Sequence, residues 1–94
     1  MVLIYREDPM SIDTTFATAV ELLAKEQGQD LRELAHKVMA LSNPDISIRE
    51  FRRIRRPDTK GRLRNLTLRE AYEFSRALGK TVDDMIAYGL THED

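Results

Sequence analysis

The sequence contains no cysteine, so neither a disulfide bond nor a cysteine-ligated metal site can supplement its hydrophobic core. It also lacks a long apolar run: the longest, Val2 to Tyr5, is far too short for a membrane span or for the apolar region of a signal peptide. We therefore expect a soluble cytoplasmic protein. Its 94 residues suffice for one small domain, whose stability has to come from apolar packing.

Residue patterns typical of catalytic sites are missing as well. The sequence has no Gly-rich phosphate loop, no paired acid site and no Ser-His-Asp set. The two histidines, His36 and His92, do not have the spacing of metal ligands, and we expect His36 to be an exposed helix residue. The sequence therefore predicts no enzyme activity, no metal and no cofactor.

Positive charge, by contrast, is concentrated in one segment. From Arg49 to Arg69 there are nine Lys or Arg and two acidic residues, a net charge of +7, whereas the rest of the chain has six basic and fourteen acidic residues, a net charge of −8. A concentrated cationic patch attracts polyanions. A charge run is more often a solvated helix face with paired charges, but these arginines lack acidic neighbours to pair with. We therefore expect the segment to bind a polyanion.

Apolar residues at helical spacing, together with capping residues, predict five helices that share one core. Two starts are possible for the third helix: Pro44, or Ser47, which we prefer because its hydroxyl is able to cap the helix with Glu50 three residues later. Pro57 ends that helix. The five predicted helices lie within residues 11–28, 30–41, 47–56, 67–79 and 81–89.

The chain is predicted to divide into three parts. Residues 1–10 are predicted to form an arm or short strand, residues 11–90 the helical domain and residues 91–94 an acidic tail. No partner strand is visible, so if the arm pairs, we expect it to pair with its own copy in a dimer.

Each predicted helix has an apolar face that we expect to be buried. The predicted core consists of Phe16, Ala19, Val20, Leu22, Leu23, Leu31, Leu34, Ala35, Val38, Ile48, Phe51, Ile54, Leu68, Ala71, Tyr72, Phe74, Ala77, Leu78, Val82, Met85 and Ile86.

Three segments, "DLRELAHKV", "ISIREFRRIRRP" and "LTLREAYEFSRALGKTVDDMI", resemble the helix-turn-helix DNA-binding domain of the lambda-repressor and Cro type, also called XRE-like. The resemblance spans about residues 14–88. The sequence departs from the family in the turn, where Met39 or Ala40 replaces the usual Gly, and at Leu31, where many members have Gln. The matching residues are Leu34, Ala35, Ile46, Ser47, Glu50, Ser75, Ala77, Leu78, Gly79, Asp83 and Met85.

The resemblance implies an all-α, compact five-helix bundle in which the second and third helices form a helix-turn-helix. It also implies a sequence-specific double-stranded DNA-binding transcriptional regulator, of the phage or bacterial repressor type, that acts as a homodimer. The dimer surface is expected to involve the arm from Val2 to Tyr5 or the fifth helix through Met85, Ile86 and Tyr88.

Contacts to DNA are predicted from the physical requirements of major-groove binding. The groove accommodates one α-helix, and Arg reads guanine through two parallel hydrogen bonds. Residues near the start of the third helix are therefore expected to contact base edges, and those further along or in the next loop to contact phosphates. Ser47 has a second interpretation as a helix cap only. The predicted base contacts are Ser47, Arg49, Arg52 and Arg53, and the predicted phosphate contacts are Arg32, Arg55, Arg56, Lys60, Arg62 and Arg64.

Two alternatives to DNA binding stay open. One is a protein-interaction module of the same fold, an antitoxin or antirepressor whose Arg face binds an acidic partner. The other is RNA binding by an arginine-rich helix, which often folds on contact. Fold alone does not distinguish these functions.

Overall fold

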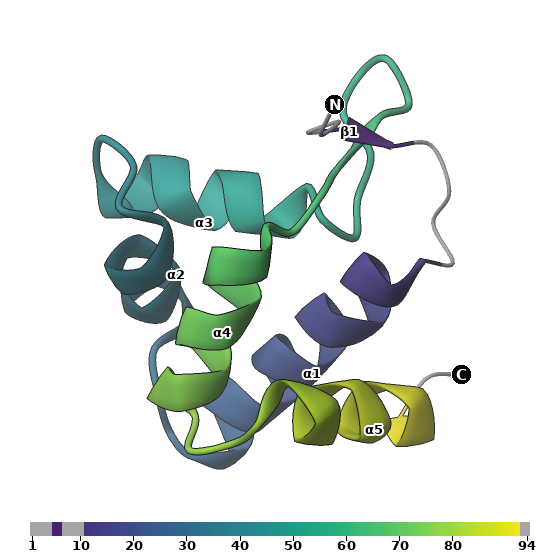
Figure 1. Ribbon diagram of the computed structural model, residues 1–94. Coiled ribbons are helices and arrows are strands. Elements are labelled where there is room, and N and C mark those ends of the chain that lie inside the picture. The colour runs from purple at the N-terminus through teal and green to yellow at the C-terminus, as the bar shows by residue number, and fades with distance from the viewer. Residues whose placement is uncertain (1–4, 7–10, 93–94) are drawn as a thin grey trace.

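A computed structural model of the protein describes residues 5–6 and 11–92 and is mostly helical (Figure 1). The described residues contain five helices, which confirms the all-α class. None of these helices is long and apolar enough to cross a membrane. The helices are α1 (Ile12–Glu26), α2 (Leu31–Met39), α3 (Pro44–Arg52), α4 (Leu68–Ala77) and α5 (Val82–His92).

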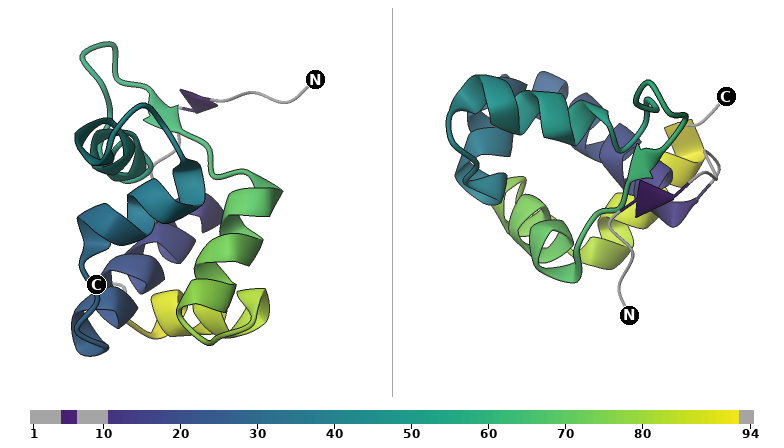
Figure 2. Two further views of the ribbon diagram at one scale, coloured as in Figure 1. Left: turned by 90° about the vertical axis from the view of Figure 1, so that its left-hand side faces the viewer. Right: turned by 90° about the horizontal axis from the view of Figure 1, so that it is seen from above.

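The helices pack as two close pairs with α4 between them. α1 lies against α5, α2 lies against α3, and α4 contacts α1, α2 and α5. Figures 1 and 2 show α3 at one end of the molecule and α5 at the opposite end. α3 is therefore supported by the rest of the domain on one side and faces outward on the others.

A pair of aromatic rings anchors α3 to the core. Phe51 of α3 and Phe74 of α4 are both fully buried, with ring centroids 5.3 Å apart and ring planes tilted by 57°. Tilted aromatic pairs of this kind add to the free energy of burial.

Ile48 of α3 and Ile54 of the turn after it are also buried, as the predicted apolar edge requires. The prediction that this helix continues to Pro57 is wrong, because α3 ends at Arg52. The spacing of Ile48 and Phe51 leaves the remaining positions of α3 free for charged side chains.

Three residues of the predicted core lie at the surface instead. Leu22, Leu68 and Tyr72 are exposed, so the predictions for them are wrong. On α4 the buried side is centred on Ala71 and Phe74, and Leu68 and Tyr72 project beyond it, where none of the described elements covers them. The apolar pattern of α4 therefore predicted a wider buried face than the one that the neighbouring helices cover.

A short antiparallel pair of strands joins the N-terminal segment to the loop before α4. β1 (Tyr5–Arg6) pairs with β2 (Leu63–Arg64), with Tyr5 opposite Arg64 and Arg6 opposite Leu63. The expectation that the arm pairs with its own copy is therefore wrong for these residues. A two-residue strand within a polar loop has too little periodicity to be recognised in a sequence. The rest of the predicted arm lies outside the described residues.

Gly89 lies where α5 crosses α1. A Cβ atom at this position would collide with the backbone oxygen of Thr15, so the two helices approach too closely for any other residue. The sequence predicted that the fifth helix ends at this glycine. α5 instead continues to His92, so the first two residues of the predicted acidic tail are helical, and the last two lie outside the described residues.

Candidate nucleic-acid interface

The N-terminus of α3 is set by Asn43 and Pro44. The Asn43 side chain accepts a hydrogen bond of 2.9 Å from the backbone N–H of Ile46, and Pro44 occupies the first helical turn, where its missing N–H has no cost. The preferred start at Ser47 is therefore wrong, and the alternative start at Pro44 is confirmed. An Asn-Pro pair was the sequence signal for this start.

The turn between α2 and α3 reverses the chain within four residues. α2 ends at Met39 and is capped by Ala40, whose left-handed conformation (φ 50°, ψ 38°) is favoured by Gly and rarely adopted by L-residues other than Asn. Its N–H donates a hydrogen bond of 2.9 Å to the carbonyl oxygen of His36. Ala40 thus has the backbone geometry that usually selects glycine after a helix.

Ser47 connects α3 to α2 and does not reach the surface. It is fully buried, and its Oγ lies 3.2 Å from Nδ1 of His36. The prediction that Ser47 contacts a base is therefore wrong, because its hydroxyl faces the interior of the helix pair. The prediction that His36 is an exposed residue is also wrong, since the ring is half-buried. Sequence reasoning missed this contact because the two residues come from different helices.

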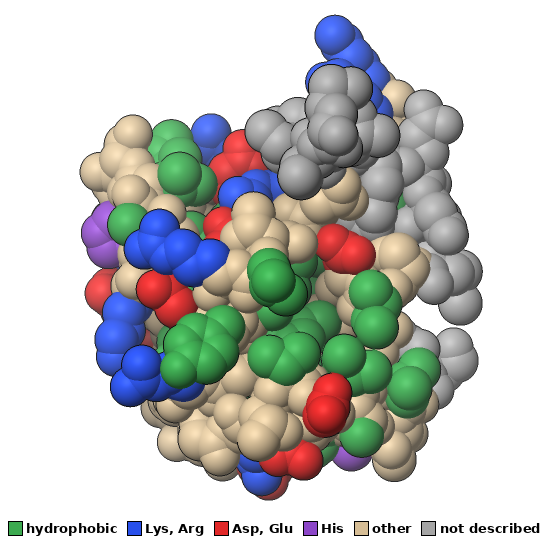
Figure 3. Space-filling model, viewed as in Figure 1, with side chains coloured by type: hydrophobic (Ala, Val, Ile, Leu, Met, Phe, Trp, Pro, Cys, Tyr) green, Lys and Arg blue, Asp and Glu red, His purple; other side chains and the backbone are tan. Residues whose placement is uncertain are grey.

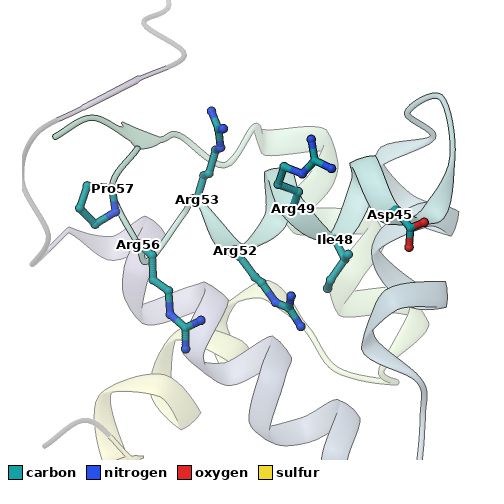
Figure 4. A pocket seen from close by; sticks show the side chains of 7 residues that line it. All are labelled: Asp45, Ile48, Arg49, Arg52, Arg53, Arg56 and Pro57. Atoms are coloured by element: carbon teal, nitrogen blue, oxygen red, sulfur yellow. The ribbon is translucent and has the colours of Figure 1, made fainter. Parts of the chain in front are cut away.

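Four arginines line an open pocket along α3 and the turn that follows it (Figure 4). Arg49, Arg52 and Arg56 are exposed, and Arg53 is half-buried. In Figure 4 the side chains of Arg49 and Arg53 extend to one side of this segment, and those of Arg52 and Arg56 to the other. Within residues 5–6 and 11–92 none of the four forms an ion pair with a carboxylate. We call these four residues the Arg cluster.

The acidic side chain at the edge of the Arg cluster is bound by a cation from outside it. Asp45 accepts a hydrogen bond of 2.8 Å from Nε of Arg32 on α2. This bond lowers the pKa of Asp45, with a smaller contribution from Arg49, and raises the pKa of Arg32. Arg32 therefore lies beside the start of α3, as a phosphate contact requires, but it is engaged with a carboxylate.

Several predicted phosphate contacts are paired, contrary to the expectation that these arginines lack acidic partners. Arg55 pairs with Glu21 of α1, and Nε of Arg62 lies 3.4 Å from Oδ2 of Asp58. Both arginine side chains are still about two-fifths exposed. Ion pairs at such exposure contribute little to stability, so they do not prevent contact with another anion.

Arg64 is committed to the protein interior. Its side chain is 13% exposed and donates hydrogen bonds of 2.9 and 3.0 Å to the two carboxylate oxygens of Glu70. Its Nε lies 3.8 Å from Oε2 of Glu50 on α3. The prediction that Arg64 contacts phosphate is therefore wrong. The sequence placed it in a polar loop, whereas the fold brings two carboxylates from separate helices to it.

The loop after α3 is held in shape by Asp58. Its Oδ1 accepts hydrogen bonds of 2.9 Å from the N–H groups of both Lys60 and Arg62, and the backbone of Asp58 bonds Gly61 and Arg62. The bond from the Arg62 N–H is the largest cause of the lowered pKa of Asp58. Gly61 has a positive φ of 77°, which permits the tight reversal. Figures 1 and 2 show this loop extending beyond the end of α3, and Lys60 within it is exposed.

The surface of α3 and the loop after it offers positive charge and an open pocket to a ligand. The described residues include no group of three His, Cys, Asp or Glu that could hold a metal ion. Comparison of the chain with protein-family models, curated proteins and solved structures finds no match. The function is therefore inferred from the geometry and charge of this surface. Five of the predicted contact residues remain accessible and without an ion pair in the described part of the chain: Arg49, Arg52, Arg53, Arg56 and Lys60.

Proposed function

We propose that the protein is a sequence-specific double-stranded DNA-binding transcriptional regulator of the repressor type. In this proposal α2 and α3 form a helix-turn-helix, and α3 enters the major groove. The observation that supports the proposal is the Arg cluster, four arginines of α3 and the turn after it that form no ion pair within the described residues, on a helix that Ile48 and Phe51 anchor to the core.

The dimensions and chemistry of the groove support this assignment. A major groove accommodates one α-helix, and a helix that fills it needs an apolar edge for the domain and polar side chains for the DNA. Arg49, Arg52 and Arg53 are our proposed base contacts, because Arg donates two parallel hydrogen bonds to guanine. Arg56 and Lys60 lie further along and are proposed to contact phosphates.

The ion-paired arginines are proposed to contribute less to DNA binding than the Arg cluster does. Arg32, Arg55 and Arg62 remain proposed phosphate contacts, since their ion pairs are exposed and a phosphate group is able to replace the carboxylate. Ser47 and Arg64 have no part in DNA contact, because one is buried and the other is bound between two carboxylates.

The proposal is tested by selecting binding sites from random duplexes. The selected duplex is then titrated with the protein at several salt concentrations. We expect one sequence to be enriched and its affinity to fall with a log–log salt slope of about −0.9 for each phosphate contacted. Enrichment of no sequence, with a steep salt slope, would reduce the Arg cluster to a non-specific electrostatic patch. Absence of duplex binding at low salt would favour an acidic protein partner, and preference for RNA would favour the RNA-binding alternative.

A further inference from the structure

Asp45 is the one acidic side chain among the seven described residues that line the pocket of the Arg cluster (Figure 4). It lies in the first turn of α3, and its side chain is 71% exposed. An acid at this position stabilises the partial positive charge at the start of a helix without any partner. Arg32 of α2 nevertheless holds the carboxylate with a hydrogen bond of 2.8 Å. An ion pair between two exposed side chains adds little to stability, so stability alone does not account for this contact.

The ion pair uses only one of the two carboxylate oxygens of Asp45. Nε of Arg32 donates to Oδ1, and within residues 5–6 and 11–92 no hydrogen bond reaches Oδ2. The bond from Arg32 lowers the pKa of Asp45, with a smaller contribution from the charge of Arg49, so the group is ionised at neutral pH. An ionised carboxylate accepts hydrogen bonds through both oxygens. Oδ2 is therefore an acceptor that is available to a ligand.

Asp45 shares one side of α3 with two members of the Arg cluster. Arg49 and Arg53 follow it at intervals of four residues, and positions four apart differ by only about 40° around a helix axis. The backbone N–H of Arg53 donates a hydrogen bond of 3.3 Å to the carbonyl oxygen of Arg49, so the helical turn continues to Arg53. In Figure 4 Arg49 and Arg53 extend to the same side, and Asp45 lies beyond Arg49 toward the start of the helix. We call Asp45, Arg49 and Arg53 the polar row.

The polar row combines the two kinds of hydrogen-bonding group that base recognition needs. Hydrophobic side chains gather on a different face, over α1, α4 and α5 (Figure 3). Base edges in the major groove present both donors and acceptors, so a surface that distinguishes the four base pairs needs acceptors as well as donors. A guanidinium group only donates, and a carboxylate only accepts. The row therefore has an acceptor at one end and two donors after it.

We propose that Asp45 is a specificity-determining residue that selects cytosine, next to guanines selected by Arg49 and Arg53. This inference rests on the proposed function, because it names the bases that the same helix reads. Oδ2 of Asp45 accepts a hydrogen bond from the N4 amino group of cytosine, and each arginine donates two hydrogen bonds to guanine. The row spans about 12 Å along the helix, and base pairs are about 3.4 Å apart. The cytosine and the guanines therefore lie within about four consecutive base pairs.

Arg32 is the positioning residue for this contact. A carboxylate on a DNA-facing surface is repelled by the phosphates, and the guanidinium of Arg32 offsets that charge while it fixes Oδ1. Its Nη1 lies 3.4 Å from Oε1 of Glu33, also on α2. A guanidinium has five N–H groups, so Arg32 is able to contact a phosphate without releasing Asp45.

Site selection from random duplexes with wild type and Asp45→Asn tests the inference through the identity of the selected base. We expect wild type to enrich cytosine at one position. Asp45→Asn should enrich adenine there instead, because an Asn amide forms two hydrogen bonds with N6 and N7 of adenine. A side chain that only stabilises the helix start or only adjusts the charge of the surface would not change the selected base.

Binding measurements with Asp45→Ala give a second readout. This variant should lower the preference for the wild-type base roughly tenfold, the discrimination typical of one base contact. It should also raise the affinity for random duplexes, because a negative charge near the phosphates is removed. Loss of fold would lower both quantities, and circular dichroism melting establishes that each variant is folded.

Arg32→Ala should lower the preference for cytosine at the same position, because Asp45 is then no longer held. Lys37→Ala is the matched control, since it removes one positive charge from another exposed position of α2. Lys37→Ala should leave the preference for cytosine unchanged. Equal effects of the two variants on that preference would refute the positioning role of Arg32.

The failure of this inference differs from the failure of the proposed function. An unchanged base preference in Asp45→Asn, or a wild-type site without cytosine at the position that Asp45→Ala affects, would overturn the inference and leave the proposed function standing. If wild type enriches no sequence, the proposed function is refuted and the inference with it. Selection with wild type alone therefore separates the two failures.

Discussion

The guanidinium of Arg64 forms a two-pronged ion pair with the carboxylate of Glu70, with hydrogen bonds of 2.9 and 3.0 Å. Both side chains are nearly excluded from solvent, at 13% and 11% exposure. Glu50 of α3 lies on the other side of Arg64, and its buried Oε2 has no hydrogen-bond partner in the described part of the chain. Arg64 therefore supplies the positive charge that offsets two carboxylates, one on α3 and one on α4.

Removal of Arg64 should destabilise the fold strongly. Arg64→Ala leaves the buried carboxylate of Glu70 without its cation and also removes the nearest guanidinium from the one-quarter-exposed Glu50. Leaving a buried charge unpaired typically costs about 3–5 kcal/mol in the free energy of unfolding. Arg62→Ala is the control, because the Arg62 ion pair with Asp58 is more exposed and worth about 0–1 kcal/mol. Urea unfolding followed by circular dichroism measures both. Similar losses in the two variants would contradict the structural role of Arg64.

Base contacts and phosphate contacts should differ in how they affect specificity. Arg49→Ala, Arg52→Ala and Arg53→Ala should each reduce preference for the selected duplex by about 1–3 kcal/mol at one base position. Lys60→Ala should weaken binding to selected and random duplexes alike and flatten the salt slope by about one. Fluorescence anisotropy with both duplexes at several salt concentrations separates the two effects. Equal losses on both duplexes for all four variants would rule out base reading by α3.

A glycine at position 40 should stabilise the protein. Ala40 has a left-handed backbone, which costs an L-residue about 1–2 kcal/mol relative to its favoured conformations, and Ala40→Gly removes that strain. Part of the gain is offset by the greater freedom of glycine in the unfolded chain, so we expect about 1 kcal/mol. Ala87→Gly in the exposed middle of α5 should instead destabilise by about 0.5–1 kcal/mol. Thermal melting of both variants should show shifts of opposite sign.

Acid should weaken the fold partly through Glu70. Burial raises the pKa of this carboxyl group, but hydrogen bonds from Arg64 and Thr67 outweigh burial and lower it below its ordinary value of 4.5. The ionised group therefore stabilises the folded state above about pH 4.5, and this contribution is lost as the pH falls through the lower folded pKa. Unfolding free energies measured from pH 6 downward should decline less in Glu70→Gln than in wild type. Parallel curves would show that Glu70 contributes nothing to the acid sensitivity.

Local features of the fold could be predicted because their causes lie within a few residues along the chain. Thr67 and Glu70 exchange hydrogen bonds at the start of α4 as the sequence pattern indicated, and Thr81 and Asp84 do the same before α5. The spacing of Ile48, Phe51 and Ile54 identified the buried edge of the third helix for the same reason. Capping and periodicity are interactions over three or four residues, which the sequence alone specifies.

Other features depended on residues that only the tertiary structure brings together. Arg64 and Ser47 looked like DNA contacts in the sequence, but Glu70 and Glu50 bind the first, and packing against His36 buries the second. Leu68 fitted a core pattern yet is exposed, because no element of the described chain covers that side of α4. The charge of the cationic segment was determined by sequence, whereas the fold decided which of its arginines stay accessible, since ion pairing and burial depend on distances between separate helices.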